Sequence, residues 1–175
     1  MTEADDPIWN GLHLTTLDFR VGVAQQILGL PPELQHLDCE DCNLDSLTPL
    51  FRFRDLRVLN ISSTRITSLE DIGHFAQLEL LYADFCSIAQ LAPLTALSKL
   101  RALDLCCSFV DFHDMTPLGQ LASLERLYLA STSIDSIGCL FALPRLKLLS
   151  VANTFVSQAE IAAFREQRPD VELWA

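Results

Sequence analysis

Cys39 and Cys42, separated by two residues, form the motif in this sequence best suited to chemistry. A Cys-x-x-Cys pair can cycle between dithiol and disulfide, or it can supply half of a tetrahedral zinc site. A zinc site needs two further thiolate or imidazole ligands, and the sequence holds neither a second Cys-x-x-Cys nor a histidine pair at ligand spacing. The motif alone leaves redox chemistry, metal binding and a structural role open.

Other catalytic arrangements have no support in the sequence. The four histidines, His13, His36, His74 and His113, lie far apart along the chain, and no Ser-His-Asp or Cys-His arrangement accompanies them. The phosphate-binding motifs G-x-x-x-x-G-K-S/T and G-x-G-x-x-G do not occur. We therefore expect no catalytic activity, no cofactor and no metal.

The elements that must position the cysteines follow from an internal repeat. Six leucines open the same phrase at intervals of 22, 22, 22, 24 and 22 residues: Leu34, Leu56, Leu78, Leu100, Leu124 and Leu146. Numbered from that leucine, positions 1, 4, 6 and 11 are apolar in every phrase, and position 9 is Cys, Ser or Thr. Six such matches in register indicate a repeat architecture.

The spacing within each phrase predicts a short strand followed by a tight return. Positions 4 and 6 lie two apart, so in a strand both point inward, while positions 3, 5 and 7 point outward. After position 11 the apolar residues recur every third residue, as in Leu91, Leu94 and Leu97, which suits a helical or 3₁₀ return with one buried face. Prolines before the middle leucine fit the first turn of that return: Pro49, Pro93 and Pro117.

This pattern resembles the leucine-rich-repeat signature L-x-x-L-x-L-x-x-N/C-x-L, and the 22-residue period is similar to the phosphatase-regulator-like class, which is largely intracellular. The resemblance implies an α/β solenoid, a right-handed superhelix with a parallel concave sheet and short helical or 3₁₀ returns. The family's usual asparagine at position 9 is absent. We expect the residues there to build a different ladder, with Thr hydroxyls bonded to nearby backbone.

We expect one domain over residues 1–175. Residues 1–33 form a divergent N-terminal repeat or cap with a short helix at 21–30, and residues 34–156 hold the six phrases. Residues 157–175 form a C-terminal cap, in which Ser157 and Glu160 make a capping box for a helix that ends near Gln167. A closing strand follows at residues 171–174.

The repeat also assigns the cysteines. Cys39 and Cys42 occupy positions 6 and 9, both inward-facing, so a structural role in the core is favoured over chemistry. Cys86 occupies position 9 as well. Cys106 and Cys107 occupy positions 7 and 8 and are expected to be accessible thiols.

Charge limits the partners. With 12 Lys and Arg against 23 Asp and Glu, the formal net charge is −11, which disfavours nucleic acid and favours a basic protein partner. Solubility explains the same charge equally well. The N-terminus lacks a secretory signal, and no apolar run reaches the roughly 18 residues of a membrane span. These features predict a cytoplasmic, monomeric protein with free thiols and no membrane partner.

The outward strand positions are the expected binding surface. Tyr82 and Tyr128, the chain's two tyrosines, flank Asp104 at position 5. Asp41 and its neighbours extend the acidity toward the N-terminal end. The predicted contact residues are Asp38, Glu40, Tyr82, Asp84, Phe85, Asp104, Phe109, Arg126 and Tyr128. A solvated strand face without a partner is the alternative, and the two-residue insertion near Phe112 and His113 is a second candidate contact.

These observations predict a non-enzymatic protein-protein interaction module that binds a basic partner on its concave face. Two alternatives stay open: an acidic immunity or inhibitor protein that neutralises a toxin or enzyme, and a bacterial effector that acts by binding a host protein.

Overall fold

The computed structural model describes residues 15–16, 23–108 and 114–175 of the 175-residue chain. Eight strands and two α-helices run in the order β1 (Thr15–Thr16), α1 (Val23–Gly29), β2 (His36–Asp38), β3 (Val58–Asn60), β4 (Leu80–Tyr82), β5 (Ala102–Asp104), β6 (Arg126–Tyr128), β7 (Leu148–Ser150), α2 (Gln158–Gln167) and β8 (Glu172–Trp174). Short 3₁₀ segments follow the strands at Thr48–Leu50, Ile72–His74, Ala92–Ala96, Thr116–Gln120 and Gly138–Leu140. The predicted alternation of strand and 3₁₀ return is confirmed.

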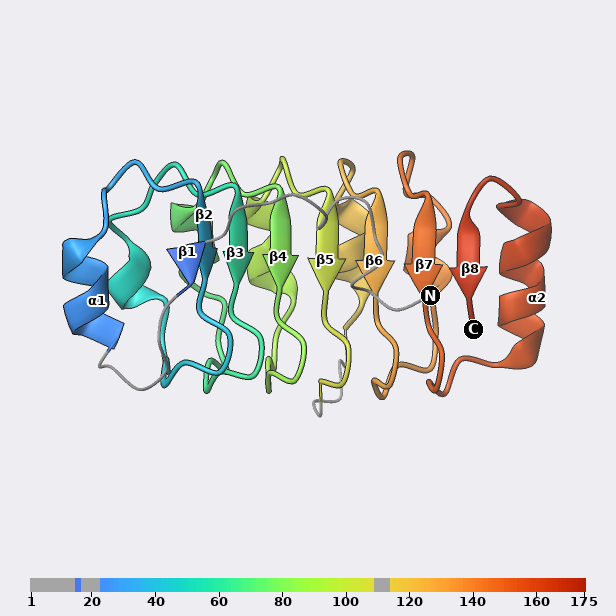
Figure 1. Ribbon diagram of the computed structural model, residues 1–175. Coiled ribbons are helices and arrows are strands. Elements are labelled where there is room, and N and C mark those ends of the chain that lie inside the picture. Colours follow the sequence, from blue (N-terminus) through green and yellow to red (C-terminus); the bar gives the residue numbers. More distant parts are fainter. Residues whose placement is uncertain (1–14, 17–22, 109–113) are drawn as a thin grey trace.

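The strands form one parallel sheet in chain order, β1 to β8. Equivalent phrase positions pair across it, for example Leu37 with Leu59 and Leu59 with Leu81. Figure 1 shows the strands side by side, with the 3₁₀ segments behind the sheet and α1 and α2 at its two ends. The fold is thus an α/β solenoid in which each repeat contacts its neighbours.

The core lies between the sheet and the returns. Positions 4 and 6 of the strands pack in one continuous cluster with the apolar residues of the returns, such as Leu59 and Ile61 with Leu69 and Ile72. All four of these side chains are at most 1% exposed. The predicted early-helix prolines are also confirmed, because Pro49, Pro93 and Pro117 occupy the first turns of their 3₁₀ segments. Among the described residues, no helix has the length and hydropathy required to cross a bilayer.

Strands β2 to β7 each end in the same left-handed turn. Among the described residues, six non-glycine residues have a positive φ, all between 54° and 57°: Asp41, Ser63, Phe85, Cys107, Ser131 and Asn153. All of them occupy position 8 of their phrase. The turn also continues the inter-repeat ladder, since the position 8 amide donates to the position 7 carbonyl of the next repeat, as from Phe85 to Cys106 at 3.0 Å.

The predicted bonding of the position 9 threonines to nearby backbone is confirmed. The hydroxyls of Thr64, Thr132 and Thr154 donate to the position 6 carbonyl of their own repeat at 2.6–2.7 Å. Cys86 instead donates to the carbonyl of Ile61 in the preceding repeat at 3.1 Å. These bonds satisfy carbonyls at the strand ends that the sheet leaves without a donor.

Arginines attach both helices to the repeats. Arg52 donates to the Ile27 carbonyl near the end of α1 at 3.1 Å. Arg168 donates to the carbonyls of Phe141 and Leu143 at 2.9 and 3.0 Å. The helix predicted to end near Gln167 is confirmed, as are the short helix within 21–30 and the closing strand.

The capping box is confirmed in one half. The Glu160 amide donates to the Ser157 hydroxyl at 3.2 Å, as predicted. The Glu160 carboxylate, however, accepts from Ser136 Oγ and from the Ile137 amide, both at 2.9 Å. It therefore links α2 to the preceding repeat.

Candidate protein-binding face

The outward face of the sheet, turned away from the 3₁₀ segments, carries positions 3, 5 and 7. Its centre and C-terminal half are buried: Asp104 is 2% exposed and Tyr128 is 0% exposed. Tyr82 and Arg126 are half-buried. The prediction that Tyr128 and Asp104 present an exposed surface is therefore wrong.

Lateral packing contributes to this burial. Val58, Leu80 and Ala102, at position 3 of three adjacent strands, form one apolar cluster, with Tyr82 packed against it. A second cluster joins Cys106, Tyr128 and Leu148 to Trp174, whose ring centroid lies 6.2 Å from that of Tyr128. Strands about 4.8 Å apart bring equivalent side chains into contact, so a side chain that points outward is not thereby exposed.

Polar side chains at position 5 form hydrogen bonds with the turns that follow the strands. Oδ1 of Asp38, Asn60 and Asp104 accepts from the position 7 amide of the same repeat, at 3.0, 2.9 and 2.9 Å. The oxygen that accepts at Asp104 is thus engaged with its own backbone. These side chains stabilise the strand-to-turn transition whether or not a partner is bound.

At the N-terminal half of this face four carboxylates gather. The acidic end consists of Asp38, Glu40, Asp41 and Asp84, and both Glu40 and Asp41 are exposed. Partial burial raises the pKa of Glu40, and the charges of Asp38 and Asp84 raise it further. Within the described part of the chain, neither Glu40, Asp41 nor Asp84 forms an ion pair. The predicted acidity toward the N-terminal end is therefore a real concentration of charge.

Phe85 follows directly after the acidic end and is 52% exposed, which makes it one of three strongly exposed large apolar residues in the described chain, with Leu28 and Phe155. The remaining predicted contact residue, Phe109, and the insertion at Phe112 and His113 lie outside the described residues. The structure thus brings together Asp38, Glu40, Asp84 and Phe85 from the predicted set.

The structure contains a ladder of ion pairs at position 2 of the repeats that was not predicted from the sequence. Arg57 lies 3.0 Å from Glu79, Arg101 lies 2.9 Å from Glu125, and Lys147 lies 2.7 Å from Glu125. A weaker contact of 3.7 Å joins Arg101 to Glu79. The alternation of sign at position 2 of successive phrases was the available signal. Here both carboxylates meet a cation, whereas Glu40, Asp41 and Asp84 meet none among the described residues.

The cysteines behave as core residues. Cys39, Cys42 and Cys86 are at most 2% exposed, and burial raises the pKa of the Cys39 and Cys86 thiols. The expectation of an accessible Cys106 is wrong, because this thiol belongs to the cluster around Tyr128; Cys107 is half-buried. In the described parts of the chain, no three His, Cys, Asp or Glu side chains are placed to hold a metal. A thiolate is disfavoured at Cys39 and Cys86, so a redox or nucleophilic role has no support there.

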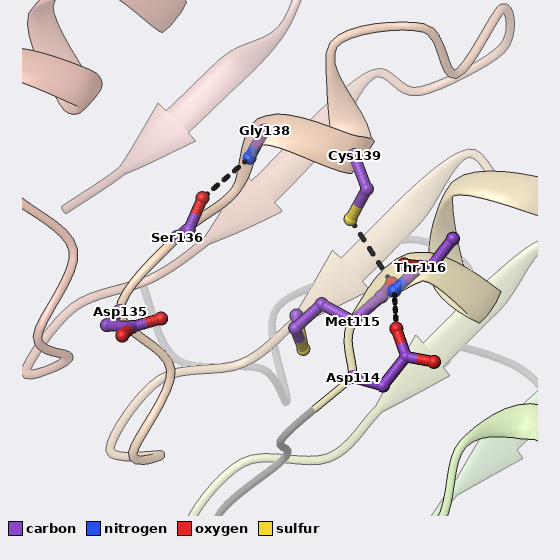
Figure 2. Close-up of a pocket in the computed structure, with 7 residues that line it drawn as sticks. All are labelled: Asp114, Met115, Thr116, Asp135, Ser136, Gly138 and Cys139. Carbon is purple, nitrogen blue, oxygen red and sulfur yellow. Dashed lines mark hydrogen bonds between the residues drawn. The ribbon is translucent and has the colours of Figure 1, made fainter.

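A polar pocket of about 280 Å³ opens between two neighbouring repeats and is lined by Asp114, Met115, Thr116, Asp135, Ser136, Gly138 and Cys139. Figure 2 shows the Cys139 thiol directed at the Met115 carbonyl, to which it donates at 3.2 Å. Asp114 Oδ1 accepts from the Thr116 amide at 2.9 Å. Burial raises the pKa of Cys139. Cys139 bonds to backbone of the neighbouring repeat and Asp114 to its own loop, so these groups are engaged with backbone and form no catalytic arrangement.

The fold has clear counterparts among solved structures. The internalin InlF from Listeria monocytogenes matches with a TM-score of 0.74 at 20% identity over 87% of this chain. Internalin C2 from the same species matches with a TM-score of 0.69 at 23% identity over 81% of it. The plant peptide hormone receptor RGFR1, solved in complex with RGF2, matches with a TM-score of 0.63 at 18% identity over 82%.

The match covers 43% of InlF, 60% of internalin C2 and 25% of the plant receptor. No protein-family model matches the chain, and no curated protein matches it in sequence. The likeness is therefore one of architecture. In its sheet, its returns and its counterparts, the chain has the leucine-rich-repeat fold.

Proposed function

We propose that the protein is a non-enzymatic interaction module that binds a basic segment of a partner protein at the acidic end of its outward face. The observation that carries this proposal is the group of carboxylates of Glu40, Asp41 and Asp84, which face no cation among the described residues. Clustered like charges repel one another, and a cationic partner relieves that repulsion.

The contrast within the same chain supports the proposal. At position 2 of the repeats Arg57, Arg101 and Lys147 neutralise Glu79 and Glu125. If the carboxylates served solubility alone, those at position 2 and those at the acidic end would need no different pairing. Recognition of a cation requires carboxylates without an ion pair, and Glu40, Asp41 and Asp84 are such carboxylates in the described chain. The leucine-rich-repeat counterparts include a receptor solved with its ligand, which shows that this architecture can hold a partner.

The proposal extends to the protein's setting. We place it in the cytoplasm as a monomer, in keeping with the 22-residue repeat class. All six cysteines lie in the described residues as free thiols, as suits a reducing compartment. A toxin-neutralising immunity protein is a particular case of the same mechanism, in which the basic partner is an enzyme or toxin.

Capture from an extract of the native source tests the proposal. The full chain serves as bait beside two variants that each lose two charges: Glu40→Gln with Asp84→Asn, and Glu70→Gln with Asp71→Asn on the return side. We expect wild type and the return-side variant to retain the same basic protein, released by salt and identified by mass spectrometry. Loss of that protein from the first variant supports the function. Equal capture by all three baits, or capture of no basic protein, contradicts it.

A further inference from the structure

Two side chains beside the acidic end contribute little to the packing and hydrogen bonding of the fold. The first is the Ser62 hydroxyl. Ser62 is 2% exposed, and its Oγ is, with that of Ser108, one of two buried serine hydroxyls without a hydrogen-bond partner in the described chain. A buried hydroxyl without a partner loses hydration for no gain, so such a group in a folded protein needs an explanation.

Ser62 stands in the middle of a row. It occupies position 7 of its repeat, between Glu40 and Asp84 at position 7 of the adjacent repeats. The backbone ladder fixes this order. The Asp41 amide donates to the backbone carbonyl of Ser62 at 3.1 Å, and the Ser63 amide donates to the backbone carbonyl of Asp84 at 3.0 Å. Neighbouring members are thus separated by about 4.8 Å, the spacing of adjacent strands.

The second feature is Phe85. Its φ is 54°, in the left-handed region that position 8 adopts in every repeat. The other residues at position 8 are Asp, Ser, Cys, Ser and Asn, all small, whereas Phe is bulky and disfavoured there. The strained residue is also 52% exposed, so its ring contributes little to the core. Strain that the fold does not use marks a candidate functional residue.

Resting on the proposed function, we propose that these features form a two-part anchor for a lysine followed by an apolar residue in the partner protein. The Ser62 hydroxyl is buried in the free protein, so its side chain rotates toward the row on binding. The three N–H groups of the lysine ammonium then meet oxygens of Glu40, Ser62 and Asp84. The apolar side chain packs against the Phe85 ring.

The chemistry favours lysine over arginine. An ammonium carries three donors around one point, which suits three acceptors in three adjacent repeats. A guanidinium is planar and best matched to the two oxygens of a single carboxylate. Ser62 supplies the neutral acceptor that fills the middle of the row.

The test uses the full chain labelled with ¹⁵N and three blocked tetrapeptides. These are acetyl-Gly-Lys-Leu-Gly-amide, its glycine analogue acetyl-Gly-Lys-Gly-Gly-amide, and the charge control acetyl-Gly-Glu-Leu-Gly-amide. We expect the Lys-Leu peptide to shift the amide signals of Ser62 and Phe85 in a saturable way. The Lys-Gly peptide should bind about tenfold more weakly, and the Glu-Leu peptide should cause no shift.

Two variants separate binding from folding. Ser62→Ala removes a buried hydroxyl without a partner, so we expect a thermal stability equal to or above that of wild type and an affinity for the Lys-Leu peptide several-fold weaker. Phe85→Asn places at position 8 the residue that Asn153 already provides in the last repeat. This variant should raise the Tm by about 2–4 °C and weaken binding of the Lys-Leu peptide about tenfold. Phe155→Asn, which removes another exposed phenylalanine away from the row, should leave the affinity unchanged.

Equal shifts with the Lys-Leu and Glu-Leu peptides would overturn the anchor, as would affinities within twofold of wild type in both Ser62→Ala and Phe85→Asn. If both variants also retain the basic protein captured from extract at wild-type strength, the anchor fails and the proposed function stands. If wild type captures no basic protein, the function itself fails.

Discussion

Glu125 shows how one residue stabilises the repeat stack through charge. It accepts from Arg101 at 2.9 Å and from Lys147 at 2.7 Å, and these bonds lower its pKa to about 2. The carboxylate therefore favours the folded state at pH values above its ordinary pKa near 4.5. That contribution is lost as the pH falls from about 4.5 through about 2, since the unfolded chain binds the proton first.

The first prediction concerns Glu125→Gln. Because Arg101 and Lys147 are largely exposed and solvent screens the pair, we expect a loss of about 1–2 kcal/mol in unfolding free energy at pH 7. The difference from wild type should fall to less than half at pH 3. Urea unfolding at both pH values measures it, with Glu166→Gln on α2 as a control that changes little. An equal difference at both pH values would contradict the assignment.

The cysteines give a second prediction at the residue scale. In the folded protein we expect Cys107 and Cys139, both half-buried, to react first with a thiol reagent. Cys39, Cys42 and Cys86 should react only as fast as the protein unfolds, because they are buried and a thiolate is disfavoured at Cys39 and Cys86. Rapid titration of Cys39 and Cys42 in the folded protein would reopen a redox role for the pair.

At the scale of elements, Gly119 leaves room for two neighbouring returns to stack closely. A Cβ at Gly119 would lie 2.6 Å from the backbone oxygen of Cys139 in the next repeat. The close approach thus joins Thr116–Gln120 to Gly138–Leu140. The turns that follow the strands instead require a left-handed backbone conformation at position 8 of each repeat.

We expect Gly119→Ala to destabilise the protein by about 1–3 kcal/mol, since the contact is with backbone and cannot be relieved by a rotamer change. Gly29→Ala is the matched control: a Cβ there meets nothing within 4 Å. Denaturant unfolding of both variants measures the difference. Equal stability of the two variants would mean that the returns separate without cost.

The elements were predictable from spacing, and the turns between them were not. Apolar residues two apart and three apart determine the faces of strands and returns, so Leu59, Ile61 and Leu69 could be assigned to the core. The left-handed turn carries no glycine in any repeat, and Phe85 gives no hint of it. The residue that is least suited to the conformation could be recognised only after the backbone was known.

At the scale of the whole molecule, the acidic binding face was predicted in part. The repeat register correctly placed Glu40 and Asp84 in one column, because equivalent positions pair across a parallel sheet. It could not predict that Tyr128 and Asp104 are buried, since the direction of a side chain does not determine what covers it. The candidate site therefore moves from the centre of the sheet to its N-terminal half.

The net charge of −11 acts across the whole molecule, but only part of it is available to a partner. Within the described residues, the position 2 carboxylates of Glu79 and Glu125 pair with cations, whereas those of Glu40, Asp41 and Asp84 form no ion pair. Association with a basic partner should therefore depend on salt, and the dependence should come from the acidic end.

The binding of a basic partner at the acidic end is tested most directly by calorimetry. The affinity of the captured protein for the chain is measured at low and at high salt. We expect Glu40→Gln with Asp84→Asn to weaken binding by about 10- to 100-fold at low salt and to flatten the salt dependence. Glu70→Gln with Asp71→Asn removes the same charge from the return side. It should leave the affinity and its salt dependence nearly unchanged. Equal weakening by the two variants would show that net charge alone attracts the partner, and would contradict a binding site at the acidic end.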